Sequence, residues 1–70
     1  MPKITDISSA QAVRVLEKIG YRVIRQGKHI VMSNGQTRLT IPRHNPINAF
    51  TMGSIADDAG LTPEAFKRMV

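Results

Sequence analysis

The sequence predicts an α+β domain in which a three-stranded antiparallel sheet carries its helices on one face. Asn34-Gly35 lies between apolar runs and is the strongest short-range hairpin signal, and Gln26-Gly27 predicts a second tight turn. Amphipathic helical patterns precede and follow this segment. The resulting order, α-β-β-β-α, is the one found in double-stranded RNA-binding domains, although a shared fold does not determine function.

The first helix is expected to extend from an N-cap at Ser8 to about Ile19. Ser8 and Gln11 have the spacing of a capping box, in which each side chain binds the backbone N–H of the other residue. Apolar residues then recur on one side of the helix, and Gly20 is expected to end it in the left-handed conformation.

The predicted strands cover residues 21–25, 29–33 and 37–42. Counting outward from the two turns places His29 opposite Ile24 on one side and Thr40 on the other. Side chains alternate faces along a strand, so the core face receives Tyr21, Val23, Ile30, Met32, Leu39 and Ile41. The open face receives Arg22, Ile24, His29, Val31, Arg38 and Thr40.

Beyond the sheet, the proline-containing segment 42–46 predicts an irregular loop that reaches Phe50. Thr51 is the expected N-cap of a second helix, which Gly60 ends. Thr62-Pro63 is expected to begin a short third helix.

The chain has 70 residues and no cysteine. This length predicts one domain, residues 1–70, whose core supplies about 3–5 kcal/mol of net stability. Without cysteine there is no disulfide or thiolate metal site, and two histidines without clustered carboxylates make a poor metal site, so no metal or other cofactor is expected. There is no apolar run long enough to span a bilayer and no signal-peptide pattern, so we expect no membrane association and a cytoplasmic protein.

The formal net charge is +5, and the positive charge is concentrated on the predicted sheet. Residues 21–43 contain no acidic residue, and their basic residues are Arg22, Arg25, Lys28, Arg38 and Arg43. A surface of one sign favours binding of a polyanion, nucleic acid first. The alternative is that these side chains only keep the sheet soluble and its edges unpaired.

His29 is the first candidate for a catalytic residue. Histidine ionises near neutral pH, which suits it to general acid–base catalysis. Arg22, Lys28 and Arg38 are suited to hold phosphates and to stabilise the charge of a pentacoordinate transition state. This combination favours RNA cleavage by the ribose 2′-hydroxyl, which needs no metal. The alternative is an exposed histidine that merely occupies a strand position.

His44 is the second histidine, and it lies in the loop after the third strand. In one interpretation it shares a cleft with His29, so that the two imidazoles act as acid and base. In the other it is a solvated loop residue.

Several short motifs occur in an order and spacing that together are specific. They are Leu16-Glu17-Lys18-Ile19-Gly20-Tyr21, Gln26-Gly27-Lys28-His29, Leu39-Thr40-Ile41-Pro42-Arg43-His44 and Ala59-Gly60-Leu61-Thr62. In these motifs the chain resembles the HicA (YcfA-like) mRNA-interferase toxins, from Ser8 to Phe66. The resemblance implies a fold like the double-stranded RNA-binding domain, metal-independent cleavage of mRNA, and His29 as the active histidine. The family often has Gly-Ser-His where this chain has Gly27-Lys28-His29, so Lys28 is expected to contact phosphate in place of a turn hydroxyl.

We therefore expect the toxin of a type II toxin–antitoxin system, an endoribonuclease with His29 as general acid or base. The expected RNA-binding residues are Arg22, Lys28, Arg38, Arg43 and His44. The resemblance also implies a HicB-type antitoxin that covers the active face, and both a homodimer and a toxin–antitoxin hetero-oligomer are open. The alternatives are a noncatalytic double-stranded RNA-binding module and a protein-interaction domain.

Overall fold

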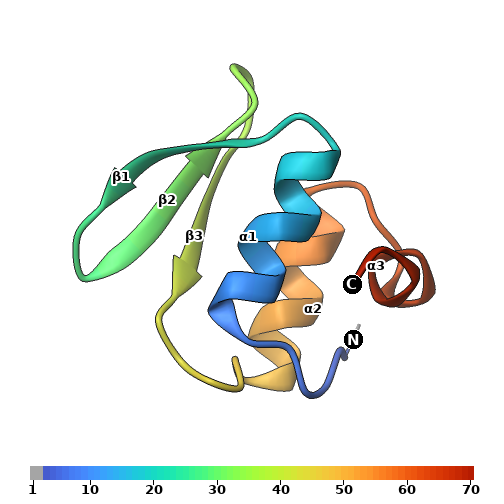
Figure 1. The fold of residues 1–70 in the computed structure, drawn as a ribbon. Coiled ribbons are helices and arrows are strands. Elements are labelled where there is room, and N and C mark those ends of the chain that lie inside the picture. The colour runs from blue at the N-terminus through green and yellow to red at the C-terminus, as the bar shows by residue number, and fades with distance from the viewer. Residues whose placement is uncertain (1–2) are drawn as a thin grey trace.

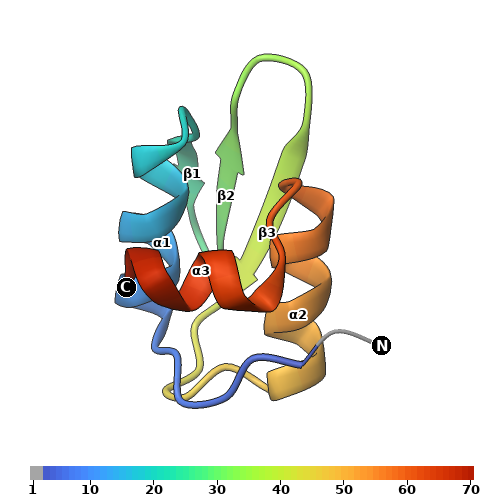
Figure 2. The same ribbon diagram turned by 90° about the vertical axis from the view of Figure 1, so that its right-hand side faces the viewer.

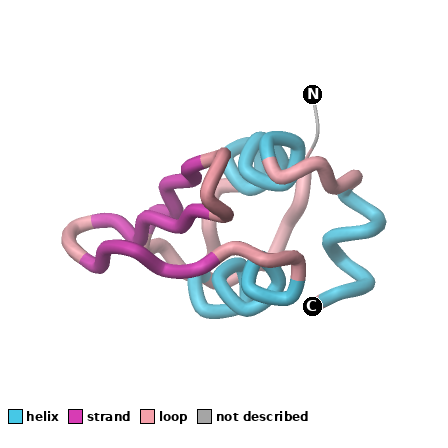
Figure 3. Tube along the Cα trace, turned by 90° about the horizontal axis from the view of Figure 1, so that it is seen from above, coloured by secondary structure: helices cyan, strands magenta, loops and turns pink. Residues whose placement is uncertain are grey.

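The computed structural model describes residues 3–70. Their elements are α1 (Ser9–Lys18), β1 (Arg22–Gln26), β2 (His29–Ser33), β3 (Arg38–Pro42), α2 (Ala49–Asp58) and α3 (Pro63–Met69). The strands form one antiparallel sheet in the order β1-β2-β3. Helices α1 and α2 lie on one face of this sheet (Figures 1 and 3), and α3 bridges them on the side away from the strands (Figure 2). The predicted α+β fold and its α-β-β-β-α order are confirmed.

Both ends of α1 follow from local sequence. The hydroxyl of Ser8 accepts a hydrogen bond from the Gln11 N–H (3.2 Å), and the Gln11 side chain accepts one from the Ser8 N–H (2.9 Å). At the other end Gly20 has a φ of 103°, and the Tyr21 N–H donates to the Leu16 carbonyl (3.0 Å). The predicted capping box and glycine stop are therefore confirmed, and they fix where the chain leaves α1 for the sheet.

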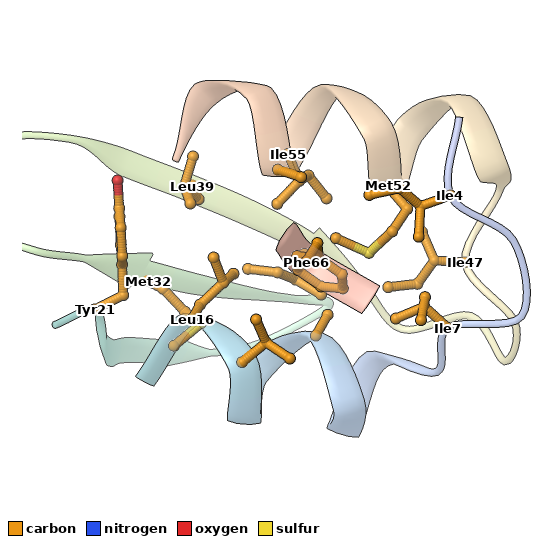
Figure 4. Close-up of a cluster of buried hydrophobic side chains, with 14 of the residues drawn as sticks. Ile4, Ile7, Leu16, Tyr21, Met32, Leu39, Ile47, Met52, Ile55 and Phe66 are labelled. Carbon is orange, nitrogen blue, oxygen red and sulfur yellow. The ribbon is translucent and has the colours of Figure 1, made fainter. Parts of the chain in front are cut away.

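The hydrophobic core lies between the sheet and the helices (Figure 4). The core face was predicted correctly: Val23 packs against the core and the other five are buried, namely Tyr21, Ile30, Met32, Leu39 and Ile41. Phe66 of α3 is fully buried among them. The segment before α1 also contributes Ile4 and Ile7, because the Ile4 N–H binds the Ala49 carbonyl and the Ile7 carbonyl accepts from Ile47.

The predicted pairing of β2 with β3 is wrong by two residues. His29 pairs with Pro42 instead of Thr40, because the chain reverses at Gly35-Gln36 and not at Asn34-Gly35. The Asn34 side chain explains this: its Oδ1 accepts from the N–H groups of the two residues that begin the return, Gln36 (2.9 Å) and Thr37 (2.7 Å). A shift of two residues keeps every side chain on its predicted face.

The predicted pairing of β1 with β2 is also wrong, because the turn between these strands lies later in the chain than expected and because β1 contains a β-bulge. Val23 pairs with Met32 and Arg25 pairs with Val31, so Ile24 is the extra residue. The turn centres on Gly27-Lys28 instead of Gln26-Gly27, and the Gly27 N–H donates to the His29 carbonyl (3.2 Å). The bulge reverses the alternation and puts Arg25 in register with a residue of the open face.

The second helix begins earlier than expected. Its N-cap is Asn48, whose Oδ1 accepts from the N–H groups of Phe50 (3.0 Å) and Thr51 (3.2 Å). Thr51 therefore lies inside α2, and the loop after β3 is shorter than predicted. The remaining boundaries are confirmed: Gly60 follows α2 with a φ of 82°, and Thr62 caps α3 through the Ala65 N–H (3.1 Å).

Candidate functional site

His29 is the first residue of β2 and is exposed on the face of the sheet opposite the helices. Its partner Pro42 has no N–H and ends β3, so the ladder of hydrogen bonds stops beside this pair. The adjoining turn lies at the point of the sheet farthest from the helices (Figures 1 and 3). The imidazole therefore belongs to a rigid strand but is accessible to a large ligand.

His29 lines an open concavity of about 520 Å³. Its lining residues come from all three strands and from the first turn, and they are Arg25, Gly27, Lys28, His29, Val31 and Thr40. The concavity thus combines an ionisable ring, two cations and a hydroxyl on one open surface. No acidic residue lines it within the part of the chain that the structure describes.

The strand register explains why Arg25 and Thr40 lie near His29. Both residues pair with Val31, which is two positions after His29 on the same strand. Diagonal neighbours of this kind have Cα atoms about 7–8 Å apart, within reach of a long side chain. Arg25 is therefore the strand-borne cation closest to the imidazole in register, and Lys28 precedes the imidazole directly in the turn.

Arg22 and Arg38 lie farther away than the sequence predicted. Both pair with Ser33, at the opposite end of β2 from His29. Four residues of extended strand correspond to about 13 Å, and neither arginine lines the concavity. The prediction that these two arginines accompany the histidine is wrong, because each turn reverses later in the chain than predicted, and this moves both arginines toward the far end of β2.

Arg43 directly follows β3, and its side chain reaches the turn between β1 and β2. Its Nε donates a hydrogen bond to the Gly27 carbonyl (3.0 Å), within the turn that carries Lys28. The structure therefore gives Arg43 a contact that positions the turn.

His44 is exposed in the loop between β3 and α2, and it does not line the concavity defined by the described residues. This loop is anchored to α1, because the Asn45 Oδ1 accepts from the Ser9 N–H (3.1 Å). Of the predicted site residues, the structure thus brings His29 and Lys28 together in the concavity. Arg43 is hydrogen-bonded to the adjoining turn, and His44 lies outside the concavity.

Sequence reasoning missed Arg25 as a site residue. Strict alternation assigns it to the core side with Val23, and only the bulge moves it to the open face. The available signal was the pair Val23-Ile24, because two consecutive apolar residues interrupt the alternation of a half-buried strand.

Within residues 3–70, no group of three or more His, Cys, Asp or Glu side chains comes together in a way that could hold a metal ion. The helices of the same residues include none that is long and apolar enough to cross a membrane.

Comparison with known protein families gives one match. The family described as the HicA toxin of bacterial toxin–antitoxin systems matches residues 9–61, which is more than half of the chain. The chain belongs to the HicA toxin family. No match is found among curated proteins or among solved structures.

The HicA match covers the whole sheet and every residue of the concavity, whereas α3 lies outside it. HicA proteins are the toxin component of toxin–antitoxin systems, so the kind of partner that this family membership implies is an antitoxin. The bare, basic face of the sheet is therefore part of the region that this chain shares with the HicA family.

Proposed function

We propose that this HicA toxin is a metal-independent endoribonuclease that cleaves mRNA, with His29 as its general acid or base. One observation carries the proposal: an exposed imidazole at the end of a bare sheet face shares a concavity with Arg25 and Lys28. A charge-bearing ribose–phosphate chain fits such a surface better than a neutral ligand does, because the surrounding cations attract its phosphates.

The chemistry is an in-line transfer at phosphorus. The ribose 2′-oxygen forms a bond to phosphorus as the bond from phosphorus to the 5′-oxygen breaks, which yields a 2′,3′-cyclic phosphate and a free 5′-hydroxyl. His29 either removes the proton from the 2′-hydroxyl or gives a proton to the departing 5′-oxygen, and solvent water makes the other proton transfer. No redox step is involved, and no metal-bound nucleophile is needed, because the nucleophile is the 2′-oxygen of the RNA itself.

Arg25 and Lys28 stabilise the charge that develops on the nonbridging oxygens. Guanidinium and ammonium groups form charge-assisted hydrogen bonds with phosphate, and their effect is largest when they are already in place before reaction. Arg25 is held by the ladder of β1 with β2, and Lys28 by a turn that Arg43 braces. The Thr40 hydroxyl lies diagonally from His29 and is suited to donate to the same phosphate.

A HicB-type antitoxin inhibits the enzyme by covering this face in a toxin–antitoxin hetero-oligomer. Residues 21–43 carry five cations and no acid, so an acidic surface on that partner complements them. The free toxin acts on mRNA in the cytoplasm and so arrests translation.

The test is incubation of the purified protein with RNA in EDTA, followed by identification of the new ends. We expect cyclic phosphate and 5′-hydroxyl termini, and we expect a single 2′-deoxy substitution at a cleaved position to abolish that cut. RNA binding without any cleavage would contradict the proposal and favour a noncatalytic RNA-binding module. Cleavage that requires added metal would contradict it as well.

A further inference from the structure

A second basic row crosses the open face at the far end of the sheet from His29. Ser33 pairs with Arg22 of β1 on one side and with Arg38 of β3 on the other, so the three residues form one rung. Both arginines are exposed, and Ser33 is half-buried between them. Residues 21–43 contain no acidic residue to neutralise the pair.

The rung offers three hydrogen-bond donors to one anion. Adjacent strands lie about 4.8 Å apart, so the backbones of Arg22 and Arg38 are separated by about 10 Å, a gap that two long side chains can close over Ser33. The Ser33 Oγ accepts a hydrogen bond from the Gly35 N–H (3.0 Å), which fixes the hydroxyl and leaves its own proton to donate. Two guanidinium groups and a fixed hydroxyl match the oxygens of a phosphate.

This rung is too far from His29 to hold the phosphate that reacts there. The two lie about 13 Å apart along β2, several times the width of a phosphate group. Between them β2 presents half-buried Val31, which pairs with Arg25 and Thr40 of the first site, and β1 presents Ile24, whose exposed fraction is 53%. A single RNA strand can contact both charged and apolar surface of this kind, because its phosphates are separated by ribose and base.

We propose that Arg22, Ser33 and Arg38 form a second phosphate-binding subsite that holds the RNA strand away from the cleaved bond. The subsite fixes the position of the strand relative to His29, and it extends the footprint of the RNA across the length of β2. This inference rests on the proposed function, because it takes RNA as the ligand. A polymer with regularly spaced charges is favoured because both basic groups lie on one continuous face.

The test measures RNA binding by the His29→Ala protein, so that cleavage does not intervene. The probes are oligoribonucleotides of one sequence, each with a single phosphate replaced by a neutral methylphosphonate. We expect one linkage away from the cleaved bond at which this replacement weakens binding about tenfold. Adding Arg22→Gln and Arg38→Gln to the same protein removes the sensitivity at that linkage and no other, whereas Arg14→Gln on α1 leaves the whole profile unchanged.

Salt dependence gives a second readout of the same subsite. The plot of log K against log salt has a negative slope. If both arginines hold one phosphate, their joint replacement makes this slope shallower by about 0.7, the value for one single-strand phosphate contact. A change twice as large assigns the arginines to two separate phosphates and overturns the single subsite.

The outcomes separate this inference from the proposed function. If no single methylphosphonate weakens binding but the wild-type protein cleaves RNA, the subsite is wrong and the proposed nuclease function is retained. If one methylphosphonate position does weaken binding but the wild-type protein cleaves no RNA, the subsite is supported and the proposed nuclease function is wrong. Unchanged RNA binding together with lost antitoxin binding in the double variant overturns the subsite and assigns the rung to the protein partner.

Discussion

The Nε of Arg43 donates a hydrogen bond of 3.0 Å to the carbonyl oxygen of Gly27. This contact joins the end of β3 to the turn between β1 and β2, in which Gly27 is followed by Lys28 and His29. The turn has few other restraints, since the Gly27 N–H bonds only to the nearby His29 carbonyl among the backbone contacts of the described chain. We therefore expect Arg43 to act through the turn, as a positioning residue.

Replacement of Arg43 by lysine is expected to reduce the cleavage rate at saturating RNA by about two- to tenfold, the effect of one hydrogen bond worth about 0.5–1.5 kcal/mol. Lysine keeps the charge but lacks the planar Nε donor. The salt dependence of RNA binding is expected to stay unchanged. A full cleavage rate in Arg43→Lys would show that Arg43 contributes charge and not position.

Arg25 is expected to contribute to cleavage, although strict alternation along the strand would place it on the core face, away from His29. The bulge at Ile24 puts it diagonal to His29, where we expect its guanidinium to bind the reacting phosphate. Arg25→Gln is expected to lower the single-turnover cleavage rate about tenfold, less than the loss of a buried oxyanion donor because the site is exposed to solvent. Arg14→Gln, an exposed arginine on α1, is the matched control and is expected to cleave normally. Equal rates in the two variants would remove Arg25 from the site.

The N-terminus of α2 gives a prediction about stability. Asn48→Ala removes the side chain that accepts from two backbone N–H groups and is expected to cost about 0.5–2 kcal/mol. Thr51→Ala is expected to cost nothing, because Thr51 is exposed inside the helix and alanine is the better helix former. Urea unfolding of the two variants checks this, and a larger loss in Thr51→Ala would place the cap at Thr51.

Phe66 anchors α3 in the core, since it is the one buried residue of that helix. Phe66→Ala is expected to cost about 3–5 kcal/mol. That is about as much as the roughly 3–5 kcal/mol of net stability that the core of so small a domain supplies. Phe66→Leu, which fills most of the space, is expected to cost about 1 kcal/mol. Chemical denaturation monitored by circular dichroism measures both. An alanine variant as stable as the leucine variant would mean that α3 is dispensable for folding.

The sequence was sufficient to assign the faces of the sheet, except at Arg25, but not the pairing of its strands. Alternation of apolar residues decides which side of a strand is buried, and that result survives any shift by two residues. The pairing depends on where each turn reverses, and there Asn34 binds two N–H groups with its side chain and moves the reversal to Gly35-Gln36. The position of Arg38 relative to His29 was wrong for this reason, and that of Arg22 because the first turn also reverses later than predicted.

The helix boundaries also divide into those that local sequence decides and those that it does not. Ser8 with Gln11 and Thr62 with Pro63 were recognisable because in each case a second residue at the required spacing marks the start of the helix. Before α2, both Asn48 and Thr51 are good N-cap residues, and the choice between them depends on the path of the preceding loop. That path is set by contacts distant in sequence, such as the Ile47 N–H with the Ile7 carbonyl (2.8 Å).

The histidine on the bare face of the sheet is the centre of the proposed mechanism, and His44 provides its internal control. The decisive measurement is the single-turnover rate of RNA cleavage in EDTA by His29→Ala and His44→Ala, each checked for native circular dichroism and melting. Both side chains are exposed, so neither change is expected to destabilise the fold. We predict a loss of about 10²–10⁴-fold for His29→Ala and a near-normal rate for His44→Ala. Wild-type cleavage by His29→Ala would contradict the account.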